Sequence, residues 1–110
     1  MKGSYLGELE ELVLLTVGIL QQEAYGVLVL QEIKEQTGRS VNISAIHAVL
    51  NRLEEKQLLK SDMGGATNER GGRRKRFYTL SAAGRTAVAE VHALRNKLYD
   101  QLPPLALNFS

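Results

Sequence analysis

A dense run of basic side chains is the part of this 110-residue sequence with the plainest chemistry. Five of the fourteen basic residues stand between positions 70 and 76, and none of the twelve acidic residues is there. Guanidinium and ammonium groups bind phosphate through charge-assisted hydrogen bonds. One basic loop on an otherwise mildly acidic chain predicts a local contact with a polyanion, although many charge runs are simply solvated. The basic residues of this loop are Arg70, Arg73, Arg74, Lys75 and Arg76.

A helical segment upstream of the loop carries side chains suited to reading base pairs. Apolar residues recur every three or four positions from Ile46 to Leu53, so one face of the segment is expected to be buried. On the other face, Asn51 and Arg52 have the hydrogen-bonding groups that match adenine and guanine, although both residue types also occur on exposed helices that bind nothing. The start of that face is small and polar, as close entry into a major groove requires. The expected contact residues are Ser44, Ala45, His47, Ala48, Asn51 and Arg52.

Other kinds of chemistry lack the residues that they need. The chain has no cysteine, which excludes disulfides and thiolate metal sites. Its two histidines, His47 and His92, are too isolated in sequence to suggest a metal site. No nucleophile with its base and no carboxylate pair stands at a recognisable spacing. We therefore expect neither an enzyme nor a cofactor.

The N-terminal segment predicts a cytoplasmic protein without a membrane partner. Its longest apolar run, residues 12–20, is well short of the roughly 20 residues needed to span a bilayer. Acidic residues at positions 8, 10 and 11 stand where a secretion signal would keep its apolar region.

Three helices are expected to position the base-reading face. The first covers residues 6–20 and becomes apolar on nearly all sides, so it should be buried. The second begins near Tyr25 and ends where Thr37-Gly38 supplies a C-terminal stop. After an extended stretch at residues 41–43, Ser44 is placed to cap the third helix.

A hairpin and a fourth helix complete the chain. Residues 58–62 and 76–80 form two strands around a tip rich in Gly, Asn and Arg. Ser81 caps a helix that ends before Pro103-Pro104, and its apolar residues follow the narrow seam of a coiled coil. The seam suits a dimer, since one small chain has little core of its own, although it could also pack within one subunit. The expected dimer contacts are Leu6, Leu9, Val13, Ala87, Val91, Leu94 and Leu98.

The order helix, helix, helix, hairpin, helix defines the expected fold class. It is mainly α with a small β-hairpin, a winged helix-turn-helix with a C-terminal dimerisation helix. Residues 1–80 are the expected DNA-binding domain, residues 81–102 the dimerisation helix packed with the first helix, and residues 103–110 a tail.

Several stretches, in this order, together cover nearly the whole chain and resemble the short, single-domain branch of the PadR family. Each is weak alone, but their joint order is specific. They are Leu12-Val13-Leu14-Leu15, Tyr25-Gly26, the run from Ala48 to Lys56, and the run from Glu69 through the basic loop to Phe77-Tyr78-Thr79-Leu80-Ser81-Ala82-Ala83-Gly84-Arg85.

The resemblance implies a dimeric DNA-binding regulator, usually a repressor, which often releases DNA when a small-molecule effector arrives. Two positions depart from the family pattern. His47 stands where a tyrosine is common, and Gln57 stands where a glycine commonly follows the third helix, so a left-handed cap there would be strained or replaced. The chain also has no tryptophan, so an indole-lined drug pocket does not carry over.

The sequence therefore predicts a transcriptional regulator whose partners are double-stranded DNA and a second copy of the chain. In this hypothesis a homodimer represses transcription from a pseudo-palindromic operator. The alternative hypothesis is a winged-helix module that binds proteins and uses its basic loop for charge complementarity.

Overall fold

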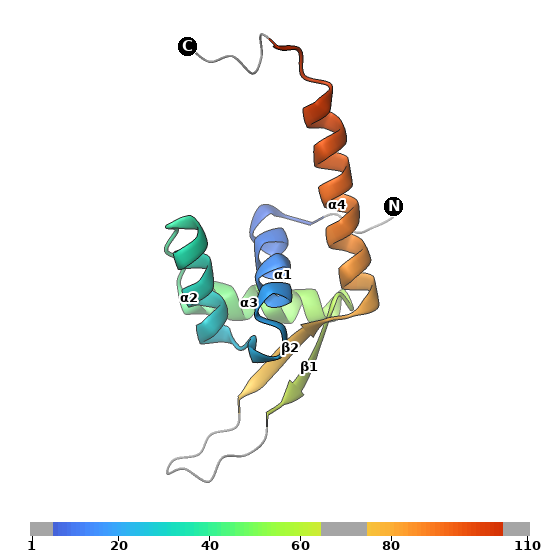
Figure 1. Cartoon of the computed structure of the whole chain (residues 1–110). Helices are drawn as coiled ribbons and strands as arrows, with labels where there is room; N and C mark the ends of the chain where they lie inside the picture. Colours follow the sequence, from blue (N-terminus) through green and yellow to red (C-terminus); the bar gives the residue numbers. More distant parts are fainter. Residues whose placement is uncertain (1–5, 65–74, 105–110) are drawn as a thin grey trace.

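Four helices and a two-stranded sheet follow one another in the predicted order (Figure 1). The structure, a computed structural model, describes residues 6–64 and 75–104. The predicted winged helix-turn-helix is confirmed. The elements are α1 (Glu8–Leu20), the 3₁₀ turn η1 (Gln21–Glu23), α2 (Gly26–Thr37), α3 (Ile43–Glu55), β1 (Leu59–Met63), β2 (Arg76–Leu80) and α4 (Ala82–Asp100).

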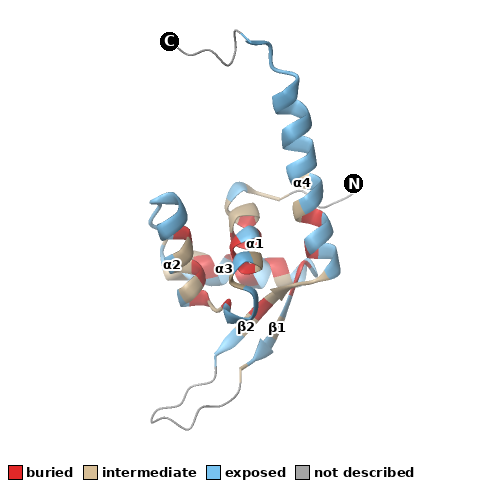
Figure 2. Cartoon of the chain, in the orientation of Figure 1, coloured by how far each residue is buried: buried red, intermediate tan, exposed pale blue. Residues whose placement is uncertain are grey.

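The core lies where α1, α2 and α3 meet the sheet, and buried residues concentrate there in Figure 2. Each fully buried aliphatic side chain stabilises such a core by about 1.5–3 kcal/mol. The third helix contributes its predicted apolar stripe. The largest fully buried side chains are Leu14, Ile33, Ile46, Leu50, Leu53, Val13, Val17 and Val29.

The ends of the helices are set by local hydrogen bonds. Asn42, and not the predicted Ser44, is the N-cap of α3: its side chain accepts a hydrogen bond from the Ala45 N–H at 2.9 Å. Ser44 was the wrong cap because the helix starts two residues earlier, and asparagine caps as well as serine does. The predicted Ser81 cap of α4 is confirmed, and it accepts from the Gly84 N–H at 2.9 Å. Gly38 ends α2 with a φ of 75°, as predicted.

The hairpin is antiparallel, with Leu59 opposite Leu80 and Met63 opposite Arg76. The second strand has the predicted bounds, and the first begins one residue later than predicted. The Tyr78 N–H donates to the Ala24 carbonyl at 2.8 Å, which ties β2 to the connection between α1 and α2. The base of the hairpin is thereby fixed against the helical core.

The fourth helix leaves the core at the end of the molecule opposite the hairpin (Figure 1). Its start is close-packed: a Cβ on Gly84 would collide with the backbone carbonyl of Leu58. Ala87 is also buried, whereas Leu94 and Leu98 are 55% and 56% exposed. The predicted seam is therefore divided between a part that packs within the chain and a part that is exposed.

Candidate nucleic-acid interface

The outer face of α3 presents the small and polar residues expected of a DNA-reading helix. Ser44, His47, Ala48 and Asn51 are exposed, and Ala45 is half-buried. The apolar stripe beneath them is fully buried, so the rotation of the helix about its axis is fixed. These five predicted contact residues are thus brought together on one accessible surface.

A hollow of about 550 Å³ lies beside this face, between the start of α2, the middle of α3 and the start of β2. The ring of His47 packs against the start of α2, because a Cβ on Gly26 would lie 2.5 Å from its Cε1 atom. The residues that line the hollow are Tyr25, Gly26, Val27, His47, Asn51, Lys75, Arg76 and Tyr78.

Two basic residues of the predicted wing reach this hollow. The Nζ atom of Lys75 lies 4.6 Å from the centre of the Tyr25 ring, within the range of a cation–π contact. That ring packs edge-on against Phe77, with the ring centres 5.4 Å apart. Arg76 donates from Nη1 to Ser61 Oγ at 2.8 Å, and Ser61 donates to Glu54 at 2.6 Å. The other wing candidates, Arg70, Arg73 and Arg74, lie outside the described residues.

Tyr25 is the residue of this surface that sequence reasoning missed. It was recognised as the start of a helix, but its aromatic ring also supports Lys75. The pairing joins positions 50 residues apart in sequence, so only the fold brings it out. Tyr78, the other tyrosine here, is buried, and burial together with the Glu54 charge raises its pKa.

Arg52 differs from its neighbours on α3, because it forms an ion pair within the chain. Its Nε atom lies 3.0 Å from the Glu10 carboxylate, which Lys56 also contacts at 3.0 Å. Burial alone would raise the pKa of Glu10. Hydrogen bonds from the Gly7 N–H, Lys56 and Arg52 lower the pKa, and together they outweigh the effect of burial. The pKa of Glu10 therefore lies below its ordinary value of 4.5. The pair fixes the end of α3 to the start of α1.

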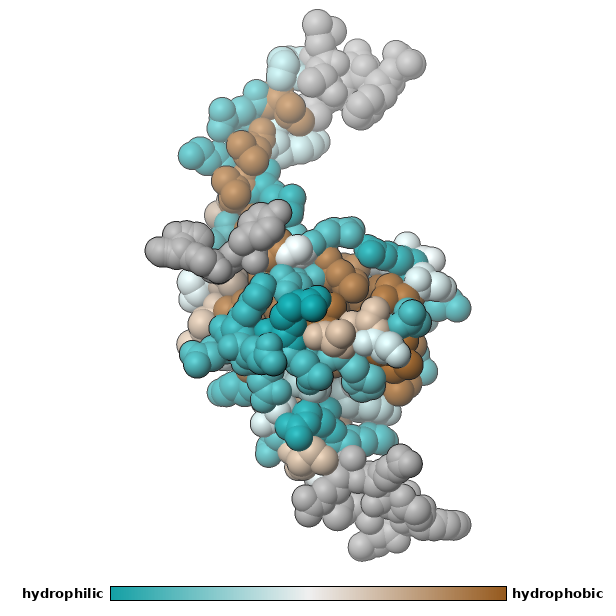
Figure 3. Space-filling view, turned by 180° about the vertical axis from the view of Figure 1, so that it is seen from behind, coloured by the Kyte–Doolittle hydropathy of each residue, from teal (hydrophilic) through white to brown (hydrophobic). Residues whose placement is uncertain are grey.

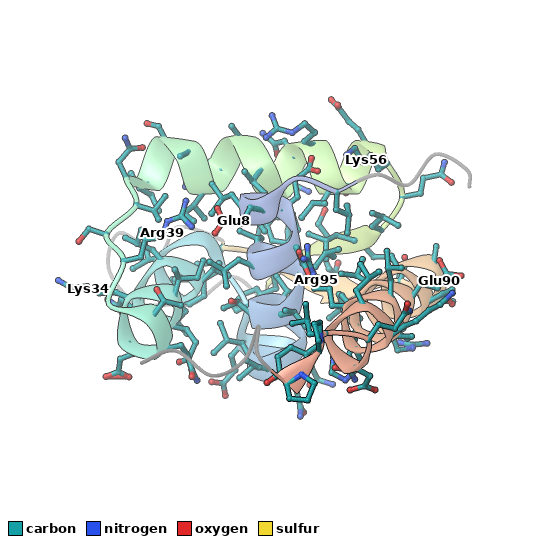
Figure 4. The ribbon with its side chains drawn as sticks, turned by 90° about the horizontal axis from the view of Figure 1, so that it is seen from above. Glu8, Lys34, Arg39, Lys56, Glu90 and Arg95 are labelled. Atoms are coloured by element: carbon teal, nitrogen blue, oxygen red, sulfur yellow. The ribbon has the colours of Figure 1, made fainter. Side chains whose placement is uncertain are left out.

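The first turns of α1 bind three different parts of the chain in this way (Figure 4). Glu8 pairs with Arg39 in the connection between α2 and α3, at 3.0 Å. Glu11 accepts two hydrogen bonds from Arg95 of α4, at 2.8 and 3.0 Å. With Glu10, these carboxylates link α1 to both α3 and α4.

The exposed part of α4 carries an apolar strip, which appears as brown side chains along the helix in Figure 3. Of the predicted dimer contacts, Leu6, Leu9 and Val91 are half-buried. Val13 and Ala87 are buried by their own chain, so the prediction that they contact a partner is wrong. Val13 lies on the inner side of α1, and Ala87 lies on the part of α4 that packs against its own chain. The exposed apolar residues of the strip are Leu94, Leu98, Tyr99 and Leu102.

The part of the chain that the structure describes shows neither a metal-binding cluster nor a membrane-spanning helix. No group of three or more His, Asp or Glu residues within residues 6–64 and 75–104 could hold a metal ion. Within the same ranges, no helix has the length and apolar character needed to cross a membrane.

A protein of Lysinibacillus sphaericus with the name Uncharacterized protein X is 32% identical to this chain over 75 residues. The matched segment covers 66% of each protein, so the chain spans just under two thirds of this relative.

Solved structures share the fold over most of the chain. A PadR-like transcription factor from Bacteroides fragilis is 23% identical, with a TM-score of 0.71 and 84% of each chain covered. A PadR family regulator from Eggerthella lenta is 27% identical, with a TM-score of 0.65, over 84% of this chain and 80% of that one. Bacillus subtilis PadR, solved in complex with operator DNA, is 20% identical, with a TM-score of 0.62, over 76% of this chain and 45% of that one.

The match to a family covers α2, α3 and the hairpin, which border the candidate interface. Residues 14–90 match the family described as transcriptional regulator PadR-like. This segment runs from the core of α1 through α3 and the hairpin into α4. The chain therefore belongs to the PadR-like family of transcriptional regulators.

Proposed function

We propose that the chain is a sequence-specific DNA-binding repressor that acts as a homodimer on a pseudo-palindromic operator. One observation carries the proposal: the exposed polar face of α3 and the basic start of β2 border the same hollow. A helix in the major groove and a wing on the neighbouring backbone need this arrangement. The operator complex of Bacillus subtilis PadR, which shares the fold, supports it.

The residues divide into two roles in this proposal. Asn51 reads a base, with the small side chains of Ala45 and Ala48 allowing close approach, and Ser44 and His47 contact the DNA beside it. Lys75 and Arg76, with Arg70, Arg73 and Arg74 of the same loop, bind phosphates. The wing then supplies affinity, and α3 supplies most of the sequence preference.

The dimer in this proposal forms through residues 81–102, which include the exposed strip of α4. Leu94 and Leu98 are 55% and 56% exposed, and exposure of apolar side chains to water is unfavourable. Pairing of two copies through this strip would bury them. A two-fold dimer reads half-sites about 34 Å apart, or a multiple of that distance. The link from α4 through α1 to α3 offers a route by which a small-molecule effector could alter DNA binding.

The experiment compares Asn51→Ala with Arg52→Ala on an operator in which each base pair is replaced in turn. Asn51→Ala should cost about 1–3 kcal/mol and relax preference at one base position. An equal loss on every sequence would make Asn51 a backbone contact and contradict its assigned role. For Arg52→Ala, a loss at one base position assigns this side chain to a base, and a uniform loss assigns it to its pair with Glu10.

A further inference from the structure

The hollow between α2, α3 and β2 combines features that a bound phosphate requires. Its described lining contains two cations, Lys75 and Arg76, and no carboxylate. It also contains one imidazole, that of His47, which can donate two hydrogen bonds when it is protonated. The volume of about 550 Å³ is open to solvent and exceeds what a single phosphate group needs.

Both Lys75 and His47 are held in place by neighbouring groups. The Lys75 ammonium lies over the face of the Tyr25 ring, 4.6 Å from the ring centre, in a cation–π contact. Because Gly26 has no side chain, the ring of His47 can lie directly against the start of α2. The geometry points to a preformed seat for an anion, with groups from three separate elements.

We propose that this hollow binds one phosphodiester of the DNA backbone, and that protonation of His47 tightens the contact. The proposal rests on the proposed function and adds a site and a regulating variable to it. Histidine is the side chain that ordinarily changes its charge between about pH 5 and 8. A DNA phosphate favours the imidazolium form, so DNA binding and proton uptake at His47 strengthen one another.

The other groups that line the hollow with His47 are neutral or cationic. The start of α2 presents the neutral phenol of Tyr25, and α3 itself presents the neutral amide of Asn51. From β2, Lys75 and Arg76 present positive charge, and the phenol of Tyr78 is neutral. A phosphate bound in the hollow adds negative charge beside the imidazole and favours its protonated form, which couples the proton to the DNA.

The test is a titration of binding to a random-sequence duplex at low, constant ionic strength, where phosphate contacts dominate. Between about pH 8 and 5.5, the affinity of the wild-type protein should rise by at least about fivefold. His47→Gln should remove this rise, whatever its affinity at the alkaline end. The chain has only one other histidine, so His92→Gln is the matched control and should keep the full rise.

A second variant moves the imidazole without removing it. Gly26→Ala places a methyl group 2.5 Å from Cε1 of His47, so the ring must swing out of the hollow. The His47 side chain is exposed and can move away from the new methyl group, so the fold should be retained. Circular dichroism checks this. The rise in affinity at low pH should shrink as it does in His47→Gln.

Three outcomes would overturn the proposal, and they separate it from the function on which it rests. Duplex binding that does not change with pH removes the His47 contact but leaves DNA binding intact. A full rise retained in His47→Gln assigns the titrating group elsewhere. Absence of duplex binding at every pH by a folded protein would overturn DNA binding itself and this site with it.

Discussion

Gln57 adopts a backbone conformation that usually belongs to glycine. Its φ is 67°, directly after the end of α3. The Leu58 N–H donates to the Leu53 carbonyl and the Gln57 N–H to the Glu54 carbonyl, each at 2.9 Å, which is the Schellman arrangement. The prediction of a strained or replaced cap resolves to strain, because the motif is kept with glutamine. Ser81 also donates to the Gln57 carbonyl at 2.8 Å, so the cap of α3 is tied to the start of α4.

Replacement of Gln57 by glycine should stabilise the protein. A side chain in the left-handed region costs roughly 1–2 kcal/mol, and the greater entropy of unfolded glycine offsets part of this gain. The net increase in the free energy of unfolding should be about 0.5–1 kcal/mol in urea denaturation. Gly38 provides the converse control, because Gly38→Ala at a φ of 75° should destabilise. A loss of stability in Gln57→Gly would contradict the account of strain.

Glu10 shows why the role of Arg52 was not evident from the sequence. A helix-surface arginine beside an asparagine looks the same whether it reads a base or holds another helix. The distinguishing partner lies 42 positions earlier, and its side chain is only 8% exposed. In the sequence, the acidic residues at positions 8, 10 and 11 argue against a secretion signal but do not show which basic side chains they pair with. The clustering of three carboxylates on one short segment was the available signal, because such a cluster is expected to form ion pairs with basic side chains elsewhere in the fold.

Replacement of Glu10 by glutamine should destabilise the protein by about 1–2 kcal/mol at neutral pH, because the charged hydrogen bonds to Arg52 and Lys56 are lost. The pKa of Glu10 is lower in the folded chain than its ordinary 4.5. Its contribution is therefore complete above that value and disappears as the pH falls through the lower, folded pKa. Urea denaturation of both proteins should show their stabilities converging below about pH 4. A difference that persists unchanged into acid would contradict the role of the Glu10 charge.

At the scale of elements, apolar spacing located the helices, and a loop rich in Gly, Asn and Arg between two short runs located the hairpin. The boundaries were less accessible. The choice between Asn42 and Ser44 as the cap of α3 depends on one hydrogen bond, and both residue types can make it. Along α4, the same apolar spacing covers a part packed on its own chain and a part that is exposed. The sequence pattern alone could not show where the packed part of α4 ends and the exposed part begins. The packed part is fixed by tertiary contacts, such as the close approach of Gly84 to Leu58, which apolar spacing does not reveal.

The exposed strip of α4 predicts an interface that charge should break. Leu94→Glu with Leu98→Glu would place carboxylates on both sides of a two-fold contact, where like charges repel. Sedimentation should show the wild type as a dimer and the double variant as a monomer with unchanged helix content. Asn96→Glu, on the opposite side of the same helix, is the control and should remain dimeric. A double variant that still sediments as a dimer would place the interface elsewhere.

At the scale of the whole molecule, α4 and the hairpin project from the core in opposite directions (Figure 1). This separates the surface that would join two copies from the surface that would meet DNA. The carboxylates of α1 connect them, through Arg95 on one side and through Arg52 and Lys56 on the other. In the proposed function, this arrangement leaves one surface for a partner copy and a separate surface for a duplex.

The most direct measurement is a salt titration of binding to DNA upstream of the protein's own gene, beside a random duplex of equal length and composition. The account predicts tighter binding to the upstream DNA. It also predicts a linear fall of log affinity with log salt, with a slope of about 0.9 for each phosphate contacted. Lys75→Ala with Arg76→Ala should reduce that slope by at most about 2 per protomer and leave the preference unchanged. A folded dimer that binds neither duplex at low salt would contradict the account and favour a protein-binding module.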